Sequence, residues 1–197
     1  MATLLFQGHG SLRVIAKDGA VVYIDPYAGE GYDKPADLVL VTHQHHDHNK
    51  TELVTMKPDG VVITESDALK DGVYHEFEHK GIKVQTVMAH NVNHHAQQCV
   101  GYVVTVDGVK LYFAGDTSGT NDMKVLLPGL ALDYAFLPID GVYNMDSKEA
   151  AACAEKIGAK HNVPIHMTPG QLFDRSAAEQ FAGPNRLIIE AGQEIEL

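Results

Sequence analysis

The chain has no tryptophan and only two cysteines, Cys99 and Cys153, among its 197 residues. Two thiols cannot form a disulfide framework or a four-cysteine zinc site. We interpret them as buried, reduced thiols, which are typical of a reducing compartment. No apolar run reaches the roughly 18 residues that a spanning helix needs. The first ten residues lack the basic stretch and long apolar core of a secretory signal. The sequence predicts a cytoplasmic protein.

Positive charge is also scarce, since 15 Lys and Arg stand against 26 Asp and Glu, a net charge of −11. An acidic chain of this kind is a poor electrostatic partner for nucleic acid or anionic membranes. We therefore expect a small-molecule substrate, no nucleic acid and no membrane partner, and the sequence is compatible with a homo-oligomer. The length and the 45% apolar content favour one globular domain over residues 1–197.

Two segments share one pattern, a hairpin followed by a buried strand. Asp18-Gly19 marks the turn of the first hairpin, and Asp107-Gly108 marks the turn of the second, 89 residues later. The strands that follow, 37–42 and 133–138, are uniformly apolar, as in a sheet covered on both faces. This weak repeat predicts two similar β-rich halves that pack sheet to sheet with helices outside. Helices are expected over residues 50–57, 146–157 and 176–182.

The densest cluster of reactive side chains directly follows the apolar strand 37–42. Residues 43–48 contain four histidines and one aspartate. A loop at the carboxyl end of a buried strand is where open sheets place their sites. Imidazole nitrogens and carboxylate oxygens are donors that suit zinc, manganese or iron. The segment therefore predicts a functional metal site.

The motif His43-x-His45-x-Asp47-His48 resembles the His-x-His-x-Asp-His motif of the metallo-β-lactamase fold hydrolases, and the resemblance covers nearly the whole chain. It extends to Asp25-Pro26, to Gly115-Asp116-Thr117 and to the late strand that ends at His166. Within that superfamily, residues 8–11 (GHGS) and 89–93 (AHNVN) are similar to a small stand-alone branch that includes the ascorbate-phosphate lactonases.

The resemblance implies both a fold and a paired metal site. The implied fold is an α/β (α+β) four-layer αββα sandwich of two mixed β-sheets flanked by helices. The implied cofactors are two divalent metal ions per chain, with zinc expected first and manganese or iron as alternatives. One ion would take His43, His45 and a third histidine, the other would take Asp47, His48 and His166, and Asp116 would bridge them.

The third histidine has three candidates, His90, His94 and His95. In the superfamily this ligand lies about four residues before the next strand, and that spacing favours His95. His90 follows the preceding strand closely, and His94 is the remaining alternative.

The resemblance also implies a metal-dependent hydrolase. Two divalent cations would share a water molecule, lower its pKa and polarise the bond that is attacked. Asp47, the expected catalytic residue, would orient the resulting hydroxide with its free oxygen. Because only Asp47 and Asp116 among the implied ligands are anionic, two cations should leave the site positive, which favours a small anionic ester, lactone or related substrate. The alternatives are a phosphodiesterase with the same metals and a non-catalytic metal-binding protein.

Several other residues have less specific interpretations. Asp25 is expected to orient a ligand histidine through the ring N–H that the metal does not use. His9 either contacts the site or fills a packing role. Asp140 and Tyr143 follow a buried strand and are candidates for lining a substrate pocket.

Overall fold

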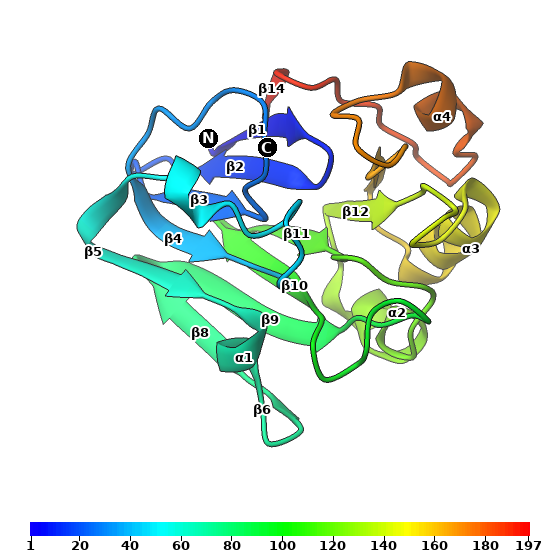
Figure 1. Cartoon of the computed structure of the whole chain (residues 1–197), viewed down its shortest axis with the longest axis horizontal. Coiled ribbons are helices and arrows are strands. Elements are labelled where there is room, and N and C mark those ends of the chain that lie inside the picture. Colours follow the sequence, from blue (N-terminus) through cyan, green and yellow to red (C-terminus); the bar gives the residue numbers. More distant parts are fainter.

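The computed structural model describes all 197 residues, and two six-stranded mixed sheets dominate it (Figure 1). The first sheet has the order β14-β1-β2-β3-β4-β5, formed by Glu194–Glu196, Thr3–Gly8, Ser11–Ile15, Val21–Ile24, Ala36–Leu40 and Met56–Ile63. The second has the order β13-β12-β11-β10-β9-β8, formed by His161–Ile165, Tyr134–Pro138, Val109–Phe113, Val100–Val106, Ile82–Met88 and Glu76–His79.

The remaining elements are short. A separate ribbon pairs β6 (Leu69–Lys70) with β7 (Val73–Tyr74). The helices are α1 (Glu65–Ala68), α2 (Asp122–Val125), α3 (Ser147–Ile157) and α4 (Arg175–Gln180), with 3₁₀ turns η1 (Thr51–Leu53) and η2 (Leu127–Leu130). The longest helix has 11 residues, and none is long and apolar enough to cross a bilayer.

The repeated hairpin-plus-strand pattern is confirmed as a repeated topology. In the first sheet β2 and β3 pair antiparallel, and β4 then adds parallel to β3. In the second sheet β10, β11 and β12 repeat that arrangement. We call residues 11–40 (β2 to β4) the upstream unit and residues 100–138 (β10 to β12) the downstream unit.

Side chains alternate between the two faces of each strand, and those that face the other sheet form the core. Val22 and Leu38 face inward and join one buried cluster of 44 residues that also takes Tyr102 and Leu111 from the second sheet. The hydroxyl of Tyr102 donates to the carbonyl oxygen of Val41 at 3.0 Å, which ties the two sheets together. The strand residues that alternate with these point to the outer faces of the sheets.

The two outer faces are covered differently. Helix α3 packs on the second sheet with the buried residues Ala150, Cys153, Ala154 and Ile157. The outer face of the first sheet carries a small apolar cluster that includes Tyr23 and Val39. Segment 26–35 covers this cluster and is held there by a hydrogen bond from the Tyr23 hydroxyl to the carbonyl oxygen of Lys34, at 2.9 Å.

The two-sheet α/β fold is therefore confirmed, but the helix expected over residues 50–57 is wrong. Only the single 3₁₀ turn η1 forms there. Met56 already pairs with Ala36 of β4, so sheet hydrogen bonding competes with any continuation of the helix.

Parallel pairing decides where the functional side chains meet. Strands β3 and β4 run parallel in the first sheet, and β11, β12 and β13 run parallel in the second. In each sheet the segments that follow these strands therefore leave from one edge. The 3.3 Å contact between Nε2 of His48 and Oδ1 of Asp116 places the two edges at the same end of the sandwich. These segments begin with Asp25, Val41, Ala114, Ile139 and His166.

Candidate metal centre

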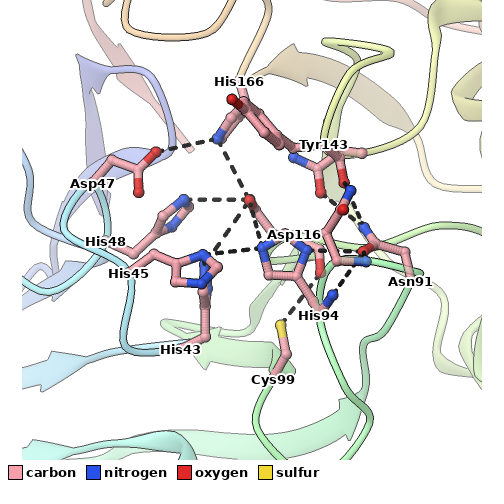
Figure 2. A network of polar contacts seen from close by, with 12 residues as sticks. His43, His45, Asp47, His48, Asn91, His94, Cys99, Asp116, Tyr143 and His166 are labelled. Atoms are coloured by element: carbon pink, nitrogen blue, oxygen red, sulfur yellow. Dashed lines mark hydrogen bonds and ion pairs between the residues drawn. The ribbon is translucent and has the colours of Figure 1, made fainter.

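Side chains from four separate segments converge at this end of the sandwich (Figure 2). The loop after β4 supplies His43, His45, Asp47 and His48, and the loop between β9 and β10 supplies His94. Asp116 follows β11, and His166 follows β13. Histidines and carboxylates collected in this way, most of them buried, form a candidate metal centre.

Three imidazoles form the first group. Nδ1 of His45 lies 3.1 Å from Nε2 of His43 and 3.1 Å from Nε2 of His94. Nitrogens that share one tetrahedral zinc at about 2.0–2.1 Å lie about 3.3–3.4 Å apart. The spacing of these three nitrogens therefore suits a single cation.

A second group lies beside the first. Asp47, His48 and His166 belong to it together with His9, and their ligand atoms lie within 4.8 Å of one another. Oδ2 of Asp47 is 3.7 Å from Nε2 of His166 and 3.2 Å from Nε2 of His9. A carboxylate among imidazoles offers a second place for a cation.

Asp116 stands between the two groups, as Figure 2 shows. Its Oδ2 lies 3.3 Å from Nε2 of His94 in the first group and 3.6 Å from Nε2 of His166 in the second. Its Oδ1 lies 3.3 Å from Nε2 of His48. One buried carboxylate therefore faces nitrogens of both groups, which is the position of a bridging ligand.

Neighbouring acceptors fix the rings of His43 and His48. Nδ1 of His48 donates to Oδ2 of Asp25 at 2.8 Å. Asp25 also accepts hydrogen bonds from the backbone N–H and the hydroxyl of Thr42, each at 2.7 Å. The Thr42 hydroxyl oxygen in turn lies 3.0 Å from Nδ1 of His43. With Nδ1 as the donor, Nε2 of each ring keeps its lone pair for the centre.

His94 and His166 also have an oxygen acceptor close to Nδ1. Nδ1 of His94 lies 2.9 Å from Oδ1 of Asn91, and Nδ1 of His166 lies 3.0 Å from Oδ2 of Asp140. The contact to Asp140 is an ion pair whose N–H is not aligned as a hydrogen bond. His45 differs, because it turns Nδ1 toward the centre and is itself exposed.

Unpartnered buried atoms test whether these residues fit metal ions. Nε2 of His48, Nε2 of His166 and Oδ1 of Asp116 are buried and have no hydrogen-bond partner in the protein. Burying a polar atom without a partner costs about 1–3 kcal/mol. Here three such atoms meet at one point, and divalent cations would satisfy all of them. The residues therefore fit metal ions.

The charge states of His43 and Asp116 match this use. Burial and the nearby His48 lower the pKa of His43 to about 2, so its ring is neutral. Burial acts to raise the pKa of Asp116, but the charges of His48 and His166 outweigh it and hold that pKa well below its usual range. Metal ligation needs neutral imidazoles and ionised carboxylates.

Burial acts to lower the pKa of His48, but the carboxylates of Asp116 and Asp25 outweigh burial and raise that pKa in the absence of metal. His166 behaves in the same way. Burial acts to lower its pKa, but the carboxylates of Asp116, Asp140 and Asp47 outweigh burial and raise the pKa to about 9. A cation at this position therefore competes with a proton for Nε2.

The backbone is strained where it meets the centre. His9, Asp25 and His166 adopt φ values of 57°, 46° and 44°, in the left-handed region that side chains other than glycine rarely enter. A Cβ at Gly10 would lie 3.2 Å from Cε1 of His48, so only glycine lets this loop approach the ring so closely. Such strain is typical of functional sites.

The structure brings together six of the seven predicted site residues: His43, His45, Asp47, His48, Asp116 and His166. The choice of His95 as the third histidine does not match the structure, because His94 lies beside His43 and His45.

A local turn explains why His94 points inward. Oδ1 of Asn91 accepts hydrogen bonds from the backbone N–H groups of Asn93 and His94, at 2.8 and 3.0 Å, and this turn buries His94. The carbonyl of His95 accepts from the N–H of Gln98 at 2.8 Å, and the His95 side chain is exposed. An Asn three residues before a histidine is the signal that favours His94.

Sequence reasoning also underestimated His9 and Asp140. The His9 side chain is fully buried, and its ring centroid lies 3.7 Å from that of His166. Asp140 contacts His166 instead of lining the hollow above the centre. The position of His9 between Gly8 and Gly10, which lets the chain approach closely, is the available sequence signal.

Comparisons with known proteins agree with this geometry. Residues 3–166 match the model of the Beta-lactamase superfamily domain. A UPF0173 metal-dependent hydrolase of Methanoregula boonei is 40% identical over 164 residues, which cover 74% of this chain and 73% of that protein. The chain belongs to the UPF0173 metal-dependent hydrolase family. A member from Thermococcus onnurineus is 29% identical over the full length of both proteins.

Solved structures agree with the family assignment. The structure of a candidate metal-dependent hydrolase from Parabacteroides distasonis superposes with a TM-score of 0.78 at 25% identity, covering 98% of this chain and 94% of that one. Igni18, a metallo hydrolase from Ignicoccus hospitalis, shares the fold with a TM-score of 0.73 at 21% identity, covering 98% and 97%. The UPF0173 chain is thus a metal-dependent hydrolase with the metallo-β-lactamase fold.

A hollow of about 460 Å³ opens above the centre of this hydrolase. This volume is in the usual range for small-molecule sites. Its lining includes five of the central residues, and the full set is Tyr27, His45, His46, Asp47, Asn93, His94, Asp116, Tyr143, His166, Pro169 and Gly170.

Proposed function

We propose that this hydrolase holds two divalent cations and uses them to hydrolyse a small ester or lactone. His43, His45 and His94 would hold one ion, Asp47, His48 and His166 the other, and Asp116 would contact both. The observation that carries the proposal is the set of buried, unpartnered atoms of His48, Asp116 and His166 that face one another. Zinc is the expected metal, with manganese and iron as alternatives.

Bound cations of this kind supply Lewis-acid polarisation and lower the pKa of water. The protein supplies the base and the position. Asp47 lines the hollow and is 21% exposed. Burial acts to raise the pKa of Asp47, but the contacts with His166 and His9 outweigh it and lower that pKa below its usual range. Asp47 is therefore a carboxylate that can accept a hydrogen bond from an attacking water.

The lining of the hollow also favours water as the nucleophile. None of its eleven residues is a serine, threonine or cysteine. A covalent intermediate on one of those side chains would need it within hydrogen-bond reach of a base. The volume of about 460 Å³ suits a small molecule rather than a polymer.

Reconstitution tests this proposal directly. The metal-free protein is loaded with zinc, manganese or iron(II), its metal content is measured by elemental analysis, and 4-nitrophenyl acetate, γ-butyrolactone and bis(4-nitrophenyl) phosphate are assayed. We expect about two ions per chain and turnover of the ester or lactone that chelation abolishes and metal restores. Turnover of the phosphodiester alone would establish the alternative activity. A fully loaded protein without any turnover would reject the enzymatic role for these substrates.

A further inference from the structure

Four carboxylates, not two, surround the central histidines. The side chains of Asp25, Asp116 and Asp140 are 3%, 5% and 0% exposed, and that of Asp47 is 21% exposed. Their four negative charges match the four positive charges of two divalent cations. The anionic substrate expected from the sequence rests on the charges of Asp47 and Asp116 alone. With Asp25 and Asp140 included, the loaded centre is close to neutral.

The hollow above the centre offers no cation of its own. Its eleven lining residues include no lysine and no arginine. A neighbouring hollow of about 290 Å³, beside His45 and His94, also has neither and contains Glu65. Proteins recognise phosphate and carboxylate groups mainly with arginine and lysine side chains. A charged substituent away from the reacting bond would therefore lose its hydrating water without gaining a cationic side chain as a partner.

Three exposed apolar residues belong to the two loops beside the hollow. Tyr143 lines it, Val142 precedes Tyr143 in the chain, and Val92 precedes the lining residue Asn93. Val92, Val142 and Tyr143 are 96%, 62% and 51% exposed. Their two loops are joined, because the side-chain amides of Asn91 and Asn93 donate to the carbonyl of Tyr143 at 2.8 and 3.1 Å (Figure 2). We call Val92, Val142 and Tyr143 the apolar rim. Exposed apolar groups on the loops beside a pocket typically mark a binding surface.

Tyr27 supplies an aromatic surface on the Asp47 side of the hollow. Its ring centroid lies 5.2 Å from that of His9 and 6.1 Å from that of His46. The apolar rim lies on the His94 side, where Asn93 also lines the hollow. The hollow therefore has apolar surface at both sides of a central polar floor.

We propose that the site selects an uncharged substrate, an ester or lactone with an aryl or alkyl group, and that Tyr27 and the apolar rim hold that group. The proposal rests on the hydrolase function proposed above and specifies its substrate class. It replaces the anionic substrate that the sequence favoured.

A matched pair of esters tests the selection. Methyl 4-acetoxybenzoate and 4-acetoxybenzoate share the acetyl ester and the ring and differ only in the distant carboxyl group, which is a methyl ester in the first and an anion in the second. With the metal-loaded protein we expect kcat/KM to be at least about tenfold higher for the uncharged ester, because the carboxylate would be desolvated without a partner. Equal values, or a preference for the anion, would overturn the proposal.

If neither ester is hydrolysed, the affinities of the two phenol products still test the preference for an uncharged ligand. Methyl 4-hydroxybenzoate and 4-hydroxybenzoate are titrated into the metal-loaded protein by calorimetry. Tighter binding of the uncharged phenol supports the selection even where the proposed ester hydrolysis fails. Equal or tighter binding of the anion rejects the selection, whatever the activity assays show.

A charge placed on the rim tests where the substituent lies. Val142→Arg adds the missing cation, and we expect it to shift the kcat/KM ratio toward the anionic ester by about tenfold. The matched control is Val125→Arg on α2, which is 71% exposed and does not line the hollow. We expect its ratio to equal that of the parent protein. An unchanged ratio in Val142→Arg, with normal metal content, would show that the rim does not hold the substituent.

Discussion

The upstream and downstream units have the same strand topology but use their carboxylates in opposite ways. In the upstream unit the carboxylate after the hairpin, Asp25, supports a ring from outside, and the loop after the parallel strand carries the central residues. In the downstream unit the carboxylate after the hairpin, Asp116, is central. There the loop after the parallel strand carries the supporting carboxylate, Asp140.

The comparison shows what topology decides and what it leaves to local chemistry. Parallel pairing brings all of these segments to one end of the sandwich. Whether a carboxylate then faces the centre or supports a ring depends on short-range geometry. Asp25, with φ of 46°, turns back to bind Thr42, whereas Asp116 follows Gly115, with φ of 64°, and faces the centre.

The most damaging change should be the loss of the central carboxylate. Asp116→Ala removes the side chain that faces nitrogens of both groups, and we expect loss of both cations and at least a roughly 1,000-fold drop in kcat/KM. Elemental analysis and ester turnover measure these effects. Glu155→Ala, at an exposed position on α3, is the control. Two ions retained in Asp116→Ala would contradict the bridging position.

Replacement of the third histidine should remove one cation rather than two. His94→Ala takes one nitrogen from the group with His43 and His45, so we expect about one ion per chain to remain. His95→Ala removes the exposed neighbour and should leave both metal content and turnover unchanged. The opposite pattern in these two variants would restore His95 as the ligand.

The supporting carboxylates should have smaller and graded effects. Asp25→Asn and Asp140→Asn keep the side-chain shape but weaken the hold on His48 and His166, and we expect metal affinity to fall about 10- to 100-fold. Asp25 should matter more, because it also holds the backbone and hydroxyl of Thr42. Competition with a fluorescent chelator measures both affinities. A larger loss of metal affinity in Asp140→Asn than in Asp25→Asn would contradict this ranking of the two carboxylates.

Alkaline pH should destabilise the metal-free protein more than the loaded one. The pKa of His166 is raised to about 9 in the folded protein, whereas an unfolded histidine titrates near 6.5. Its protonation therefore stabilises the metal-free fold fully below about pH 6.5, and this contribution is lost as the pH rises through about 9. Thermal unfolding with and without chelator should show a Tm gap that widens across this range. A Tm difference that stays constant across this pH range would contradict the raised pKa of His166.

Much of this site followed from the sequence, because short spacings and strand ends translate directly into space. The loop 43–48 leaves a buried strand, and Asp116 and His166 also follow strands that reach the same end of the fold. Periodicity alone predicts these strand ends. The resemblance to the superfamily then predicted which side chains the ends would bring together.

The remaining errors concern tertiary competition and local turns. His94 and His95 are adjacent and chemically identical, and only the hydrogen bonds of Asn91 decide which one is buried. Residues 50–57 have helical spacing, but the pairing of Met56 with β4 prevents the helix. Neither effect is visible in a pattern of apolar residues. The supporting role of Asp140 depends on a partner 26 positions away along the chain.

His45 is the exception among the rings of the centre, since it is exposed and no outside acceptor orients it. A ring without such a support can swing away from the centre at little cost. The group of His43, His45 and His94 should therefore exchange its ion with solution faster than the enclosed group around His166. If two cations bind as proposed, a shortage of metal would therefore empty this outer position first and leave the enclosed one filled.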